Sequence, residues 1–267
     1  MKTNHQLIYQ VDSFTNKAFK GNPAGVMIVS PDFGDDAMQL IAQEMNLSET
    51  AFIIPTDKHL RIRYFTPTVE VPLCGHATLA SAHILYKLGY VKMDESIHFV
   101  SQFGELIVNQ DQGWISMNFP AYDLNEMEIP TDFERLVGFE PLKCWKSDDD
   151  WVIALAESEA KITSATPLFE QLMPNGLGHL MVTAKSEKPE RDFVVRCFAP
   201  RSGINEDPVT GSAHCALTPL WHQLSGKTEL ISEQVSKRGG ILKLAYLNNR
   251  VEISGQAVTI FTAELNF

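Results

Sequence analysis

The sequence lacks the features that would link it to nucleic acid or to a lipid bilayer. Its 267 residues include 22 Lys and Arg against 33 Asp and Glu, which gives a net charge of −11, and no basic cluster interrupts this acidic excess. Phosphate backbones and anionic lipid surfaces repel such a chain. No apolar run approaches the roughly 18 residues that a membrane span needs. We therefore expect no nucleic-acid partner and no membrane partner.

Cysteine is also scarce, and its spacing is uninformative. The four cysteines, Cys74, Cys144, Cys197 and Cys215, form no C-x-x-C pair. The first residues, Met1 to Gln6, lack the apolar core of a secretion signal. Reduced thiols in a cytoplasmic protein are therefore expected rather than a disulfide framework.

Motifs for nucleotides and metals are missing as well. The chain has no G-x-G-x-x-G at the start of a helix and no G-x-x-x-x-G-K-[ST], so no nucleotide cofactor is expected. The eight histidines are scattered and form neither H-x-x-x-H nor a pairing with cysteines at zinc-ligand spacing. The sequence thus predicts neither a cofactor nor a metal site.

The clearest positive feature is an internal repeat. Residues 63–67 (RYFTP) and 196–200 (RCFAP) share the pattern R-x-F-x-P half a chain length apart, and each ends an alternating segment typical of a half-buried strand. A polar loop and a stretch of small residues follow each pattern, at 74–82 and 210–217. The shared order predicts a duplication, and the alternative is a chance match of one short pattern.

Both small-residue stretches predict buried helices, because neither carries a charged face. The first is expected to end by Gly89 and the second near Gly226, with Pro219 bending or dividing it. Many strands with one buried helix in each half indicate an α/β (α+β) fold of two similar domains, each a sheet wrapped around its helix. We expect residues 1–121 plus 257–267 to form one domain and 122–256 the other, with the ligand in the cleft between them.

Other elements are predicted outside the repeat. Asp35 or Asp36 is expected to cap an amphipathic helix. The apolar side of this helix consists of Met38, Ile41, Ala42 and Met45. Strands are predicted at 7–11, 26–29, 51–54, 60–65, 105–109, 114–118, 151–155, 180–183, 193–198, 251–253 and 259–265.

Two segments of the first half combine reactive side chains with potentially free amides. Glu49 stands between the amphipathic helix and an apolar strand, where burial would raise its pKa and suit it to acid/base catalysis; the alternative is a hydrogen-bonding Glu in a turn. Cys74-Gly75-His76 opens the first buried helix, where amides and the helix dipole favour an anion and lower a thiol pKa. The alternative is that Cys74 is a buried structural residue and that His76 is a buried histidine whose hydrogen bonds are made within the protein.

The second half has a related segment. Asp207 precedes Thr210, Gly211 and Ser212, which are expected to open the second buried helix and offer amides and hydroxyls to an anion. A simple capping sequence would explain much of this segment, but it would not explain why the arrangement occurs in both halves.

Four motifs in this order resemble the phenazine-biosynthesis PhzF-like family over essentially the whole chain. They are GNPAGV at 21–26, SETAF at 48–52, CGHAT at 74–78 and EDPVTGSAH at 206–214. The resemblance implies the diaminopimelate epimerase-like fold, with two similar domains that each hold a curved mixed sheet around a central helix. It also implies an isomerase that moves a proton on a small carboxylate-bearing metabolite without a cofactor.

The same resemblance implies roles for individual residues. Glu49 matches the family's acid/base glutamate, and His76 and Asp207 match residues that position substrate and assist proton movement. The positions that match substrate-binding residues are Ser48, Gly75, Thr210, Gly211 and Ser212. Two alternatives are a two-base epimerase or racemase that uses Cys74, and a protein of the same fold that binds a carboxylate without turnover. The first is disfavoured because Cys215 comes too late to supply a second thiol at the helix start.

The resemblance further implies a homodimer, and twofold dimers are the commonest soluble oligomers. The candidate contact surface is formed by exposed strands near residues 104–118 that are rich in apolar residues. These are Phe103, Leu106, Ile107, Val108 and Trp114, and core packing is the alternative explanation for them.

Overall fold

The computed structural model describes residues 6–148 and 150–266, and the chain forms two compact units. Unit 1 is Met1–Asn118 with Ser254–Phe267, and unit 2 is Phe119–Ile253. Residues 1–5 and 267 of the expected first domain, residue 149 of the second, and most of the stretch used to argue against a secretion signal lie outside the described residues. Among the helices that are described, none is long and apolar enough to cross a membrane.

Unit 1 holds a mixed sheet with the strand order β18–β1–β2–β3–β4–β6–β7–β8. The neighbours β2–β3 and β4–β6 run parallel, and the other neighbours run antiparallel. The short strand β5 pairs antiparallel with β4. The elements of unit 1 are β1 (Gln6–Ser13), β2 (Asn22–Ile28), α1 (Asp35–Met45), β3 (Glu49–Pro55), β4 (Leu60–Phe65), β5 (Glu70–Val71), α2 (Gly75–Lys87), β6 (Ile97–Val100), β7 (Glu105–Asp111), β8 (Trp114–Pro120) and β18 (Ala257–Leu265).

Unit 2 repeats this plan with the order β9–β10–β11–β12–β13–β15–β16. Here β11–β12 and β13–β15 run parallel, the other neighbours run antiparallel, and β14 pairs antiparallel with β13 as β5 does with β4. Its helices are α3 (Phe133–Val137), α4 (Glu159–Ser164), α5 (Phe169–Leu172) and α6 (His214–Ser225). Its strands are β9 (Leu124–Met127), β10 (Lys143–Ser147), β11 (Val152–Leu155), β12 (Leu180–Lys185), β13 (Phe193–Ala199), β14 (Ile204–Asp207), β15 (Glu229–Gln234), β16 (Gly240–Tyr246) and β17 (Arg250–Gly255). The matching order and direction of the strands confirm the duplication.

The arginines of the R-x-F-x-P patterns make matching contacts in the two units. Arg63 on β4 donates Nε and Nη2 to Glu70 at 2.7 Å, and Arg196 on β13 donates the same atoms to Glu206 at 2.7 and 3.0 Å. Each guanidinium also lies over the phenylalanine two residues later, at 5.0 and 4.9 Å from the ring centre. Bidentate pairing and aromatic stacking hold the short strand that follows against the main sheet.

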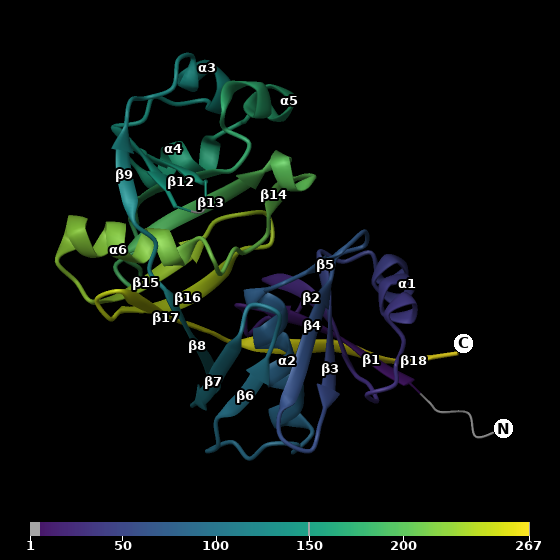
Figure 1. Cartoon of the computed structure of the whole chain (residues 1–267). Coiled ribbons are helices and arrows are strands. Elements are labelled where there is room, and N and C mark those ends of the chain that lie inside the picture. Colours follow the sequence, from purple (N-terminus) through teal and green to yellow (C-terminus); the bar gives the residue numbers. More distant parts are fainter. Residues whose placement is uncertain (1–5, 149, 267) are drawn as a thin grey trace. The chain divides into compact units, whose positions relative to one another are not determined.

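Helices cover both faces of each sheet. The central helix α2 packs on β1, β2, β3 and β18, and α1 packs on β3 and β4 (Figure 1). In unit 2, α6 packs on β15 and β16, whereas α4 packs on β12 and β13. Most side chains of α2 and α6 are buried, as their apolar composition predicts.

Three details of the helices differ from the expectations. Neither Asp35 nor Asp36 caps α1: Gly34 is the N-cap, and the Asp35 carboxylate accepts a hydrogen bond from Arg63 instead. Helix α6 begins at His214 rather than near Thr210, because turns occupy residues 211–213. Pro219 does not divide α6, which is assigned as one helix from His214 to Ser225. The expected helix ends are confirmed, with Gly89 just beyond α2 and Gly226 as the C-cap of α6.

Each strand predicted from alternation overlaps an observed strand, and 60–65 is reproduced without change. The four cysteines are free thiols. The segment offered as a contact surface is split between core and surface: Leu106 and Val108 are buried, whereas Phe103 and Ile107 are exposed.

Gly21 opens the first family motif in a backbone conformation that disfavours other residues. Its φ is +66°, and a Cβ there would lie 2.1 Å from the Ser13 carbonyl oxygen and 2.7 Å from Thr15 Cγ2. We expect Gly21→Ala to lower the free energy of unfolding by about 3 kcal/mol or more, through left-handed strain and overpacking together. Chemical denaturation monitored by circular dichroism measures this loss.

Gly34→Ala is the matched control, because φ at Gly34 is −71° and no atom lies within 4 Å of the added Cβ. Its effect should stay within about 1 kcal/mol. Equal losses in the two variants would contradict the steric explanation.

Candidate functional site

Three reactive side chains meet in unit 1. Glu49 is the first residue of β3, Cys74 is the N-cap of α2, and His76 is the second residue of that helix. Strand β3 runs parallel to β2, where Ala24 of the first family motif is the register partner of Glu49. The hydroxyl of Ser13, on β1, donates to the His76 carbonyl at 2.7 Å and ties the start of α2 to the sheet. Sheet register and helix docking together bring the three side chains to one place.

The His76 ring lies between the other two groups. Its Nδ1 is 3.3 Å from Cys74 Sγ, and its Nε2 is 3.4 Å from Glu49 Oε2. Burial of the ring lowers the pKa of His76 to about 4, an effect that a backbone hydrogen bond to Pro23 only partly offsets. At neutral pH the imidazole is therefore uncharged, and its contact with the carboxylate is not an ion pair. A carboxylate beside a neutral, buried imidazole can take up a proton and pass it on.

Backbone amides point out of the same end of α2. The first intrahelical bond runs from Thr78 N to the Cys74 carbonyl at 3.0 Å, so the amides of Gly75, His76 and Ala77 precede it. Amides at such a position, reinforced by the helix dipole, favour a carboxylate or a developing oxyanion. The start of α2 thus places the Glu49 carboxylate and the neutral His76 ring beside amides whose chemistry suits an anion.

In unit 2, Asp207 ends β14 and begins a tightly held turn. The Thr210 hydroxyl donates to Asp207 Oδ2 at 2.5 Å. Gln234 on β15 closes the turn from the other side: its Nε2 donates to the Asp207 carbonyl at 2.7 Å, and its Oε1 accepts from Thr210 N at 2.8 Å. Gln234 is completely buried, so this geometry is fixed by groups shielded from water.

The predicted site residues fall into two groups. Ser48, Glu49, Gly75 and His76 belong to unit 1, where Ser48 lies in the half-buried bend before β3. The members of the second group belong to unit 2. They are Asp207, Thr210, Gly211 and Ser212. Gly211 and Ser212 form the turn before α6 rather than its first turn, and their carbonyls accept from His214 N and Cys215 N at 3.0 Å.

The later start of α6 also corrects the argument about the second thiol. Cys215 is the second residue of this helix, not a turn too late. It is nevertheless only 3% exposed. Its depth rather than its position along the helix is what disfavours a role in catalysis.

Sequence reasoning missed two groups that shape the site. Gln234 lies far along the chain from the turn it holds, in a strand that alternation did not predict. The grouping of Glu49, Cys74 and His76 was also missed as a donor set: one ligand atom from each lies within 4.8 Å of the others. Search patterns for metal sites rely on fixed spacing, and sheet register brings Glu49 to the other two.

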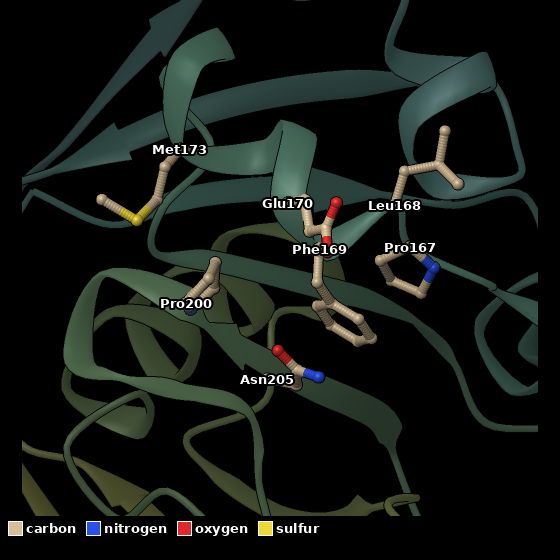
Figure 2. Close-up of a pocket in the computed structure, with 7 residues that line it drawn as sticks. All are labelled: Pro167, Leu168, Phe169, Glu170, Met173, Pro200 and Asn205. Carbon is tan, nitrogen blue, oxygen red and sulfur yellow. The ribbon is translucent and has the colours of Figure 1, made fainter.

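A separate hollow of about 560 Å³ opens in unit 2 (Figure 2). In Figure 2 the Phe169 ring points toward the Asn205 amide, and Glu170 supplies the one carboxylate of the lining. The lining residues are Pro167, Leu168, Phe169, Glu170, Met173, Pro200 and Asn205. None of them is among the site residues predicted from the four family motifs.

Comparison with known proteins agrees with the motifs. The model of the family described as phenazine biosynthesis-like protein matches residues 11–263. An uncharacterized isomerase of Halalkalibacterium halodurans is 44% identical over 259 residues, which cover 97% of each chain. The crystal structure of a PhzF-family phenazine biosynthesis protein from Enterococcus faecalis superposes with a TM-score of 0.94 at 36% identity, covering 98% of this chain and all of that one.

A more distant structure extends the likeness of the fold. A hydroxyproline epimerase from Agrobacterium vitis superposes with a TM-score of 0.60 at 10% identity, over 99% of this chain and 93% of the other. At this identity the likeness concerns the fold alone. The two-unit α/β architecture is that of the diaminopimelate epimerase-like proteins.

Proposed function

This chain belongs to the phenazine biosynthesis-like PhzF family and is an isomerase, and we propose that it moves a proton on a small carboxylate-bearing metabolite without a cofactor. Glu49 is the acid/base group of this proposal. The observation that carries it is the 3.4 Å contact between Glu49 Oε2 and the neutral, buried His76 ring at the start of α2. This pair offers a proton acceptor, a relay and an anion site together.

In the proposed reaction, the Glu49 carboxylate takes a proton from a carbon of the substrate and returns it to another carbon on the same face. Negative charge develops on the substrate as the C–H bond breaks, and the amides at the start of α2 stabilise it. Such preorganised stabilisation is usually the largest single contribution to catalysis. His76 holds the Glu49 carboxylate in place and assists the return of the proton.

We further propose that Asp207, Thr210, Gly211 and Ser212 bind the same substrate molecule from unit 2, in a cleft between the units. The duplication supports this, because the turn before α6 in unit 2 corresponds to the start of α2 in unit 1. A double-mutant cycle with Glu49→Gln and Asp207→Ala tests it. Groups that act on one substrate give strongly non-additive losses, and additive losses would separate the two sites.

Solvent exchange distinguishes the proposal from its alternatives. The purified protein is incubated in D₂O with a panel of cyclic and amino-acid-like carboxylates, and proton NMR follows each carbon. An isomerase of the proposed kind shifts a double bond and transfers or incorporates label at a second carbon. A two-base epimerase exchanges and inverts one carbon, and loses activity as Cys74→Ala. A binding protein exchanges no substrate proton.

Gln234 is expected to act as a positioning residue for Asp207. Gln234→Met keeps the shape of the side chain but removes both hydrogen bonds to the turn, so Asp207 loosens. We expect kcat to fall about 10- to 100-fold with a smaller change in KM, since misplacement by about 1 Å has effects of this size. Steady-state kinetics on the substrate found by exchange measures the split.

Gln39→Met is the control for this prediction. Gln39 Nε2 donates to the Thr66 carbonyl at 2.9 Å in unit 1, whereas the Asp207 turn belongs to unit 2. It should leave kcat unchanged. A loss of stability in Gln234→Met with unaltered kinetics of the folded fraction would show that Gln234 has only a structural role.

A further inference from the structure

The three side chains gathered in unit 1 are also a set of metal ligands. A thiol, an imidazole and a carboxylate, from Cys74, His76 and Glu49, each offer one donor atom within 4.8 Å of the other two. Zinc is bound by these three donor types, with bond lengths of about 2.0 to 2.3 Å. Tetrahedral angles then place neighbouring donors about 3.5 Å apart.

Two of the distances already have this value. Cys74 Sγ to His76 Nδ1 is 3.3 Å, and His76 Nε2 to Glu49 Oε2 is 3.4 Å. One ion takes only one ring nitrogen, so the third donor must approach by about 1 Å to complete the set. The Glu49 side chain, 21% exposed, is the most accessible of the three.

His76 supplies an independent observation in favour of a ligand. Its side chain is 9% exposed, and among the described residues its Nε2 has no hydrogen bond of normal geometry, although Glu49 Oε2 lies 3.4 Å away and the ring also interacts with the Pro23 backbone. A buried polar atom of this kind normally has a partner. A metal bound at Nε2 would supply it, and a metal at Nδ1 would leave Nε2 to donate to a neighbouring oxygen.

We propose that this triad is an inhibitory site for Zn²⁺. Binding releases the Cys74 thiol proton to solvent and forms a thiolate–zinc bond, while one His76 nitrogen and one Glu49 oxygen complete three protein ligands. The fourth position stays open to water or to an anion, as in zinc sites with three protein ligands. Glu49 then cannot accept a substrate proton, so zinc blocks the enzyme; this last step rests on the proposed function.

Cobalt substitution tests the site without any assay of activity. The full-length protein is freed of metal with a chelator and titrated with Co²⁺. We expect one ion per chain, an intense visible spectrum typical of four-coordinate cobalt, and a near-ultraviolet thiolate-to-cobalt charge-transfer band. Zn²⁺ should displace the cobalt and abolish both signals.

Variants assign the ligands. Cys74→Ser should remove the charge-transfer band, and Glu49→Gln should keep the band while weakening binding at least about tenfold, as the loss of a direct ligand requires. Cys144→Ser is the matched control, because Cys144 is another buried free thiol and lies in unit 2. No cobalt binding, or a band that survives in Cys74→Ser, would overturn the site.

Activity then tests the inhibition separately. Zn²⁺ should stop substrate proton exchange by the wild type, and chelation should restore it. If cobalt binds but zinc does not inhibit proton exchange, the proposed inhibition is wrong and the proposed metal site still stands. If the metal-free protein exchanges no substrate proton while cobalt still binds Cys74, the proposed function fails and the metal site stands.

Discussion

Glu49→Gln is expected to lower kcat for substrate proton exchange by about 10²- to 10⁴-fold, the range that general acid/base catalysis contributes. Glutamine has nearly the shape of glutamate and can keep the contact with His76, but it cannot take a proton from carbon. KM should change much less, because the amides at the start of α2 and the residues of unit 2 remain. Exchange measured by NMR over long incubations reaches rates low enough to quantify the loss.

Glu44→Gln is the control for this prediction. Glu44 is an exposed residue of α1 only five positions earlier in the chain, and the same chemical change there should leave kcat within twofold of the wild type. Full activity in Glu49→Gln would remove Glu49 from the mechanism and turn attention to Cys74 or Asp207.

A second large effect is expected on stability in acid. His214 is completely buried, with Nδ1 3.0 Å from the Thr210 carbonyl and Nε2 2.9 Å from Ser232 Oγ. Burial lowers its pKa from 6.5 to about 4. Between these two pH values the unfolded chain binds a proton that the folded chain does not, so stability falls as the pH falls. The full difference of about 2.5 pKa units corresponds to roughly 3 kcal/mol.

His83 adds a similar effect in unit 1. Its Nε2 lies 3.0 Å from Thr259 Oγ1, and burial together with the charge of Lys87 lowers its pKa to about 4. Denaturant unfolding at a series of pH values should therefore show a steep loss of stability below pH 6.5. His83→Gln should flatten this slope, whereas His98→Gln, on an exposed position of β6, should leave it unchanged. A wild-type stability that stays constant from pH 6.5 to 4 would contradict the prediction.

Local patterns were sufficient to predict most of the fold. Alternation in the sequence predicted 60–65 and 193–198 as strands, although most side chains of both strands are buried. The small residues after Cys74 predicted α2 because only a buried helix leaves no charged face. The predictions that failed depended on distant partners. Asp35 does not cap α1 because Arg63 binds its carboxylate. Arg63 lies on β4, which comes after α1 in the chain.

The start of α6 failed for the same reason. The amide of Thr210 is bonded to Gln234, and the Thr210 hydroxyl is bonded to Asp207, and these two bonds hold Thr210 in the turn that precedes the helix. The sequence around Thr210 contains no sign of Gln234. The motif residues themselves were identified from the resemblance, but the contact of Glu49 with His76 follows from the parallel register of β2 and β3, which no local pattern specifies.

The pairing of β1 with β18 has a consequence for how this chain is made. Strand β1 is flanked by β2 on one side and by β18 on the other, so one of its edges has no partner until residues 257–265 have been translated. Unit 2 is a continuous stretch that is synthesised before then. A chain that stops after residue 255 therefore lacks the partner of one edge of β1, and an unpaired sheet edge of this kind promotes aggregation.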